Sequence, residues 1–144
     1  MVHIRDEGSE FDASIEEIWK FLGSPQVHTP AHVSRRNSQV KPIGENAILL
    51  SVEQNMGGHW QKVLNRVTLL PPIGMAVEML DGPLAGSKFF TYYTPKGGKT
   101  GVTVVGEFVS KSIPPAQLES EVLRSLEETF NEDNLALRKL ASKP

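Results

Sequence analysis

Two histidines four positions apart are the residues whose spacing most directly suggests chemistry. His28 and His32 stand in the run His-Thr-Pro-Ala-His, and on a regular helix this spacing puts two imidazoles on one face, where they can bind a metal ion. Pro30 lies between them, however, and proline interrupts a helix. A metal site also needs a third ligand, and none is apparent unless His59 comes close. We therefore expect no metal site and no cofactor.

Charged residues interrupt several otherwise apolar runs. Glu78 and Glu107 each alternate with apolar neighbours. A carboxylate in an interior cavity would have a raised pKa and could act as a general acid or base. Alternation favours the solvent face instead, because an exposed polar face is the usual reason for this pattern. Arg66, like Arg35 and Arg36, is expected to form surface salt bridges, since arginine is rarely buried. Catalytic residues stay unknown, with Glu78, Glu107 and Arg66 as the candidates.

Several kinds of active site are excluded by what the chain lacks. There is no cysteine, which excludes disulfides, thiolate zinc sites, iron–sulfur clusters and cysteine nucleophiles. The sequence contains no GxxxxGK[ST] or GxGxxG phosphate-binding pattern and no GxSxG nucleophile elbow.

The N-terminal part of the chain predicts a strand followed by helices. Residues 2–11 have the pattern of a short strand. Ser14 and Glu17 have the spacing of a capping box, and the apolar residues that follow recur at helical intervals up to Leu22. A second, short helical piece is expected to begin at Ser24-Pro25 and to end before Pro30.

The central part of the chain predicts a meander of short antiparallel strands. Turn residues recur about every ten positions, between runs rich in valine, leucine, threonine and aromatic residues. We expect six strands, at about 33–41, 47–55, 60–70, 74–81, 87–94 and 100–112. Period-2 alternation within them indicates one buried face. The run 33–41 is mostly polar, which is typical of an edge strand or of a strand that lines a wet cavity.

A long amphipathic helix closes the chain. Pro114-Pro115 marks its start. Its apolar stripe is expected to lie along the sheet, and consists of Leu118, Val122, Leu126, Phe130, Leu137 and Leu140, widened by Leu123.

Length, charge and targeting signals limit the class of protein. The 144 residues suit one domain. The net charge of -2 argues against a nucleic-acid binder that relies on bulk positive charge. The N-terminus resembles no secretory signal, and no apolar run approaches the roughly 20 residues of a membrane helix. We expect a cytoplasmic protein without stable membrane insertion.

The order of elements resembles the START-like (SRPBCC) superfamily, whose members have the helix-grip fold. Three stretches carry the resemblance: FDASIEEIWKFLGSP, VEMLDGPLAGSKFFTYYTP, and GKTGVTVVGEFVS leading into PPAQLESEVLRSLEETF. It covers essentially the whole chain and is closest to the small polyketide-cyclase/dehydrase and lipid-transport-like members. It implies one α+β domain over residues 1–144, in which a curled antiparallel sheet of six or seven strands wraps around the long C-terminal helix.

The resemblance also implies a function in the space between sheet and helix. We expect the chain to bind or carry an apolar or aromatic small molecule, or a lipid, in an internal cavity there. Aromatic strand residues, the long helix and one histidine are the expected lining, namely Trp60, Phe90, Tyr92, Val122, Leu126, Phe130 and His32. An aromatic residue that faces outward would instead suggest an interface, as in a homodimer.

Two other functions stay open. One is a polyketide cyclase/dehydratase-type enzyme with a pair of acid–base residues in the cavity. In cyclase-like relatives a cavity arginine can orient an anionic or carbonyl group, and Arg66 could take that role. The other is a protein-interaction module like the chaperone activators of the superfamily, which a collapsed cavity and a large exposed apolar patch would favour.

Overall fold

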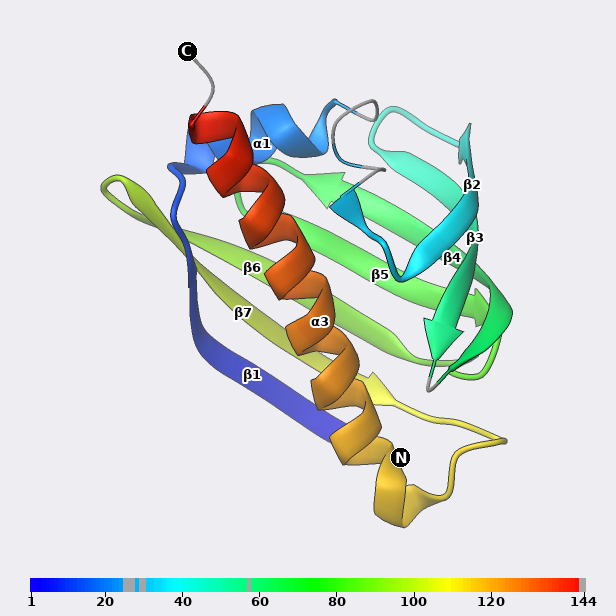
Figure 1. Cartoon of the computed structure of the whole chain (residues 1–144). Coiled ribbons are helices and arrows are strands. Elements are labelled where there is room, and N and C mark those ends of the chain that lie inside the picture. Colours follow the sequence, from blue (N-terminus) through cyan, green and yellow to red (C-terminus); the bar gives the residue numbers. More distant parts are fainter. Residues whose placement is uncertain (25–27, 29–30, 57, 143–144) are drawn as a thin grey trace.

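One antiparallel sheet of seven strands curls around a long C-terminal helix (Figure 1). The computed structural model describes residues 1–24, 28, 31–56 and 58–142. The strands lie in the order β1-β7-β6-β5-β4-β3-β2. Their bounds are β1 (Val2–Phe11), β2 (Arg35–Pro42), β3 (Ala47–Met56), β4 (His59–Leu70), β5 (Gly74–Asp81), β6 (Lys88–Lys96) and β7 (Lys99–Phe108). Among the described residues the helices are α1 (Ile15–Leu22) and α3 (Pro115–Ala141). This is the α+β architecture expected from the sequence.

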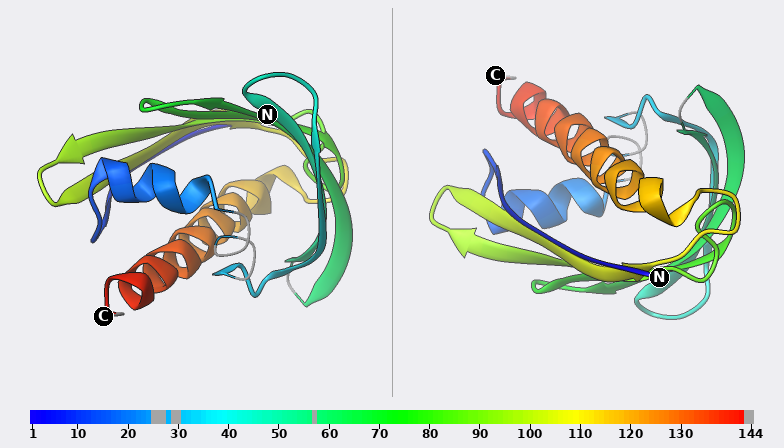
Figure 2. Two further views of the ribbon diagram at one scale, coloured as in Figure 1. Left: turned by 90° about the horizontal axis from the view of Figure 1, so that it is seen from above. Right: turned by 90° about the horizontal axis from the view of Figure 1, so that it is seen from below.

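Both helices lie on the concave side of the sheet. Figure 2 shows α1 between the sheet and the last turns of α3, while the edge of the sheet that holds β2 and β3 curves around the side of the helices. One register row of concave-facing residues runs across the sheet through Val67, Val77, Phe89, Gly106 and Ile4. A Cβ atom at Gly106 would collide with Phe89, so glycine is what allows that ring to lie against β7.

The core forms two clusters under the helices. The first, at α1, consists of Phe11, Ala13, Ile18, Phe21, Val102 and Leu137. The second, at the start of α3, consists of Ile4, Leu84, Phe108, Leu118 and Val122. Leu123 and Leu140, which were expected within the stripe of the long helix, are each 37% exposed. The buried surface of α3 is therefore narrower than the predicted stripe.

Local sequence signals account for most element boundaries. The capping box is confirmed: the Glu17 N–H donates to Ser14 Oγ, and the Ser14 N–H donates to the Glu17 carboxylate. The polar run expected as an edge strand is β2, at the end of the sheet. The last strand ends at Phe108 and not at 112, because Val109 is bonded through both its N–H and its carbonyl to the Ser87 hydroxyl.

Two further observations concern the helical parts of the chain. The short helical piece expected between Ser24-Pro25 and Pro30 lies largely outside the described residues. Within the described part of the chain, no helix combines the length and the apolar character that crossing a membrane requires.

Candidate functional site

The three catalytic candidates lie on the convex face of the sheet, away from α3. A register row of outward-facing residues contains Arg66, Glu78, Lys88, Glu107 and His3. The Arg66 guanidinium pairs with Glu78 across the strands at 3.3 Å, and both side chains are more than 40% exposed. Glu107 lies 3.5 Å from the His3 ring. These residues form surface pairs, as the alternation favoured, and none belongs to an interior acid–base site.

The two aromatic residues chosen on β6 also face outward. The rings of Phe90 and Tyr92 lie together on the convex face, with centroids 4.3 Å apart, and Tyr92 is 43% exposed. Their neighbours Phe89 and Tyr93 face the helices and pack against the core clusters. The expectation that Phe90 and Tyr92 line an interior cavity is therefore wrong, because alternation in a strand defines two faces without showing which one is concave.

Trp60 is a third residue expected in the cavity that lies outside it. Val63, three positions further along β4, is buried on the concave face, so Trp60 points to the opposite side. There the Arg36 guanidinium lies 4.0 Å from the centroid of the indole ring. The indole therefore makes a surface cation–π contact.

The α3 residues expected at the cavity do face the sheet, but they pack into the core. Val122 is 2% exposed and belongs to the second core cluster, against which Leu126 is partly packed. The ring of Phe130 stacks on Phe11 with centroids 4.6 Å apart. These side chains hold α3 on the sheet and leave little of their own surface for a ligand.

A polar cluster lies beside them, where the last turns of α3 meet the segment before β2. We call His28, His32, Ser34, Arg35, Glu132 and Asp133 the polar cluster. Glu132, whose side chain is 9% exposed, accepts three hydrogen bonds: from His32 Nδ1 at 2.9 Å, and from the Ser34 N–H and hydroxyl at 3.0 Å each. His32, the one predicted lining residue of this cluster, is 4% exposed.

Asp133 lies on the other side of the His32 ring. Its Oδ1 is 2.9 Å from His32 Nε2 and 3.2 Å from His28 Nε2. Burial acts to raise the pKa of Asp133, but the two imidazoles outweigh it and lower that pKa to about 2. An imidazole held between two carboxylates can exchange protons, and the same three residues could hold a metal ion.

Arg35 of this cluster and two further polar side chains, those of Tyr93 and Asn65, belong to the concave face of the sheet. Burial lowers the pKa of the Arg35 guanidinium, while the charges of Asp133 and Glu132 act to raise it. Burial, followed by the charge of Asp133, raises the pKa of the Tyr93 hydroxyl. Arg35 Nε and Asn65 Oδ1 are buried and have no hydrogen-bond partner among the described residues. Such atoms are uncommon in folded proteins and indicate a missing polar partner.

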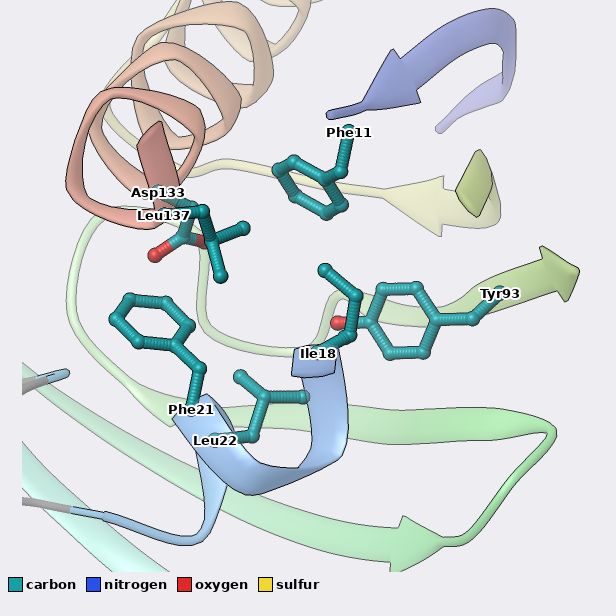
Figure 3. Close-up of a pocket in the computed structure, with 7 residues that line it drawn as sticks. All are labelled: Phe11, Ile18, Phe21, Leu22, Tyr93, Asp133 and Leu137. Carbon is teal, nitrogen blue, oxygen red and sulfur yellow. The ribbon is translucent and has the colours of Figure 1, made fainter. Parts of the chain in front are cut away.

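Two hollows lie near α1, one inside the protein between α1 and α3 and one on the surface. Figure 3 shows the Asp133 carboxylate and the Tyr93 hydroxyl on opposite sides of an apolar space between α1 and α3. Its side chains leave no room for a water molecule. An open groove of about 320 Å³ lies on the surface, lined by Ile15, Glu16, Trp19, Pro71 and Pro72.

Comparison with known proteins gives matches at the level of structure. No protein-family model matches the sequence, and no curated protein matches it significantly. A START superfamily protein from Mycobacterium smegmatis superposes with a TM-score of 0.82 at 12% identity, over 96% of this chain and 98% of that one. The chain has the START-like helix-grip fold. The expected fold is thereby confirmed.

Other solved structures share this START-like fold. The Zhui aromatase/cyclase from Streptomyces sp. R1128 matches with a TM-score of 0.73 at 13% identity, over 94% of this chain and 90% of that one. Ara h 8.0201 matches with a TM-score of 0.75 at 15% identity, over 96% and 98% of the two chains. At such low identity these matches establish the fold and leave the activity open.

Sequence reasoning missed most of the polar cluster, although one signal for it exists. Asp133 stands three residues after Phe130 and four before Leu137, and so occupies a position of the apolar stripe. A carboxylate at this position is either buried with the apolar side chains or interrupts the apolar surface of the helix. Asn65 carries a signal of the same kind, because it stands at strand spacing between the buried residues Val63 and Val67 of β4. Arg35 carries none, since polar residues surround it.

Proposed function

We propose that the protein binds an apolar or aromatic small molecule on the concave face of the sheet, beside α3. Affinity comes from burying ligand surface at about 25 cal/mol per Å². Polar groups of the concave face fix the orientation of the ligand. The observation that carries the proposal is a buried hydrogen-bond donor and a buried acceptor on this face, Arg35 Nε and Asn65 Oδ1, that lack partners among the described residues.

Apolar surface accompanies these polar atoms. Leu50 lies opposite Asn65 in the register of β3 and β4, and Asn65 lies opposite Met79 of β5. All three residues face the concave side and remain partly exposed, whereas Val52 and Val63 in the adjacent row are 3% exposed. Solvent thus reaches the concave face at this row. A ligand lying there would cover Leu50 and Met79 and could reach the amide of Asn65.

The solved structures with the same fold support this choice. One is described as an aromatase/cyclase and another as a START superfamily protein. The proposed ligand class, an apolar or aromatic molecule with a few polar groups, follows from the side chains of this chain and agrees with the first of those descriptions.

A matched pair of variants on β3 tests the proposal. The probe is N-phenyl-1-naphthylamine, a neutral aromatic dye whose fluorescence rises in apolar surroundings. Leu50→Glu puts a carboxylate on the concave row, and Leu49→Glu puts the same group one residue away on the convex face, opposite Arg66. Because a carboxylate in an apolar site costs more than about 1.4 kcal/mol, we expect Leu50→Glu to weaken dye binding at least about tenfold.

The Leu49→Glu variant should bind the dye as the unmodified protein does, within about twofold. Thermal unfolding of both variants confirms that each is folded. The proposal is wrong if the unmodified protein does not bind the dye, or if the two variants bind it equally well.

A second candidate function is a cyclase/dehydratase-type enzyme, and the polar cluster favours it. His32 contacts both Glu132 and Asp133, and the Tyr93 hydroxyl faces the same region. An imidazole held in this way can remove a proton α to a carbonyl group, which is the step that cyclisation of a poly-β-ketone requires.

The enzyme hypothesis predicts turnover that depends on this cluster. The assay follows formation of an aromatic product from a synthetic poly-β-ketone thioester. His32→Gln or Tyr93→Phe should lower the rate about 100-fold or more, whereas His59→Gln, at the exposed β3–β4 hairpin, should not change it. Binding of the ketone without turnover would leave only the binding function.

A further inference from the structure

Three ligand-type atoms from separate parts of the chain converge beside α3. His28 Nε2 and His32 Nε2 are 3.0 Å apart. Asp133 Oδ1 is 3.2 Å from the first nitrogen and 2.9 Å from the second. The three atoms therefore form a nearly equilateral triangle, and each belongs to a residue type that commonly binds transition metals.

The size of this triangle suits a metal ion. Zinc and similar ions bind histidine nitrogen and carboxylate oxygen at about 2.0–2.2 Å. Two such ligands are then separated by about 2.9 Å at octahedral angles and about 3.3 Å at tetrahedral angles. The observed separations, 2.9 to 3.2 Å, lie between these values. An ion just outside the plane of the triangle would reach all three atoms without moving the backbone.

The surroundings of His32 orient its ring for such a role. Its Nδ1 lies 2.9 Å from Glu132, and Ser34 holds that carboxylate through two hydrogen bonds. A neutral His32 that donates its Nδ1 proton to Glu132 has a lone pair at Nε2, which points toward His28 and Asp133. This carboxylate–histidine arrangement is the usual support of a metal-binding imidazole.

Hydrogen bonds within the triangle do not satisfy its atoms when His32 is neutral. The single proton on His28 Nε2 can be donated to His32 or to Asp133, and the 2.9 Å contact between His32 Nε2 and Asp133 Oδ1 then brings two lone pairs together. Asp133 Oδ1 is in fact buried without a well-aligned hydrogen-bond donor among the described residues. A cation between these atoms would accept the lone pairs of all three.

The elements around the triangle hold it in place. The His28 N–H donates to the Ser24 carbonyl at 2.9 Å. The carbonyl of His32 accepts from the Arg35 N–H, which joins the histidine to the start of β2. Asp133 is fixed by α3. We expected no metal site from the sequence because no third ligand was apparent; Asp133, far along the chain, is a candidate for that ligand.

We propose that His28, His32 and Asp133 bind a divalent transition-metal ion such as zinc or iron(II). Two imidazoles and one carboxylate suit these ions, whereas magnesium and calcium prefer sites made of oxygen atoms. The carboxylates of Glu132 and Asp133 outnumber the single nearby guanidinium, that of Arg35, so the site attracts a cation. Three protein ligands leave coordination positions for water or for an oxygen atom of a bound molecule.

Metal titration tests the site without any organic ligand, so its result is independent of the proposed binding function. The protein is dialysed against EDTA and then against metal-free buffer. Zinc is added in a calorimeter, and cobalt(II) is added separately while its visible absorption is recorded. We expect one equivalent of zinc with a Kd below about 1 μM, and one equivalent of cobalt(II) that zinc displaces and magnesium does not.

Variants show whether the binding belongs to these residues. His28→Ala and Asp133→Asn should each weaken zinc binding by more than about 100-fold, and Glu132→Gln by about 10–100-fold. His59→Ala, which removes an exposed histidine outside the triangle, should bind as the unmodified protein does, within about twofold. The His28 side chain is 26% exposed, so its replacement keeps the test valid even if Asp133→Asn does not fold.

Three results would overturn the proposal. First, the unmodified protein binds no zinc, which would mean that hydrogen bonds alone explain the cluster. Second, His28→Ala and Asp133→Asn bind zinc as well as His59→Ala does, which would place the ion elsewhere. Third, magnesium competes with zinc equally, which would exclude a transition-metal site.

Discussion

Replacement of Glu132 by alanine should destabilise the protein far more than the same change at another glutamate of α3. Glu132 accepts hydrogen bonds from the His32 ring and from both the N–H and the hydroxyl of Ser34, and its side chain is 9% exposed. Alanine leaves these donors buried without an acceptor. It also removes the link between α3 and the segment that precedes β2.

The size of this effect follows from the donors that lose their partner. A buried donor left without an acceptor costs about 1–3 kcal/mol, so we expect the loss of the acceptor shared by these three donors to cost about 3–5 kcal/mol. With a urea m-value of about 2 kcal/mol/M, that loss lowers the unfolding midpoint by about 1.5–2.5 M. The control is Glu128→Ala, whose partner Arg124 lies 3.0 Å away with both side chains more than 40% exposed. This exposed pair contributes about 0.2–1 kcal/mol.

Urea unfolding followed by circular dichroism measures both variants against the unmodified protein. A loss of less than about 1 kcal/mol in Glu132→Ala, which is the loss expected for Glu128→Ala, would contradict this prediction. It would mean that His32 and Ser34 find other partners or water, and that the polar cluster does not join α3 to the sheet.

Three other perturbations have defined outcomes. Gly106→Ala should cost about 1–3 kcal/mol in urea unfolding because of overpacking, whereas Gly98→Ala, with nothing within 4 Å of the added atom, should change stability by less than about 0.5 kcal/mol; equal losses would contradict this. The hydrogen bond from Arg138 lowers the pKa of the Asp12 carboxyl. The contact therefore stabilises the folded protein above the ordinary carboxyl pKa, and this stabilisation is lost as the pH falls through the lowered pKa. Asp12→Asn should therefore reduce the difference in unfolding free energy between about pH 7 and about pH 3, and an unchanged difference would count against this contact. If two copies associate through the exposed face at Tyr92, the unmodified protein should sediment as a dimer and Tyr92→Asp as a monomer. An unmodified protein that sediments as a monomer would exclude that interface.

Period-2 alternation predicted the strands well and their faces incompletely. It separated Phe89 from Phe90, and Tyr92 from Tyr93, but nothing in either pair indicates which member faces α3. That choice depends on how the whole sheet curls, which is a property of seven strands together. The same limit explains why Trp60 was assigned to the wrong face. Glu78, by contrast, could be placed on the solvent side from its apolar neighbours.

The polar cluster was harder to predict because its members are distant in sequence. His28 and His32 are recognisable as a pair, yet their partners Glu132 and Asp133 lie on the last helix. A carboxylate within an apolar stripe was the available sign, at Asp133. Which segment that carboxylate meets depends on the path of the chain from α1 to β2, and local patterns do not specify that path.

Amide chemical-shift mapping shows where on the protein a small apolar molecule binds. The ¹⁵N-labelled protein is titrated with N-phenyl-1-naphthylamine. Binding on the concave face should give the largest shifts at Arg35, Leu50, Asn65 and Met79, and these shifts should disappear in Leu50→Glu. Shifts confined to the surface groove at Ile15 and Trp19, or no shifts at all, would contradict it.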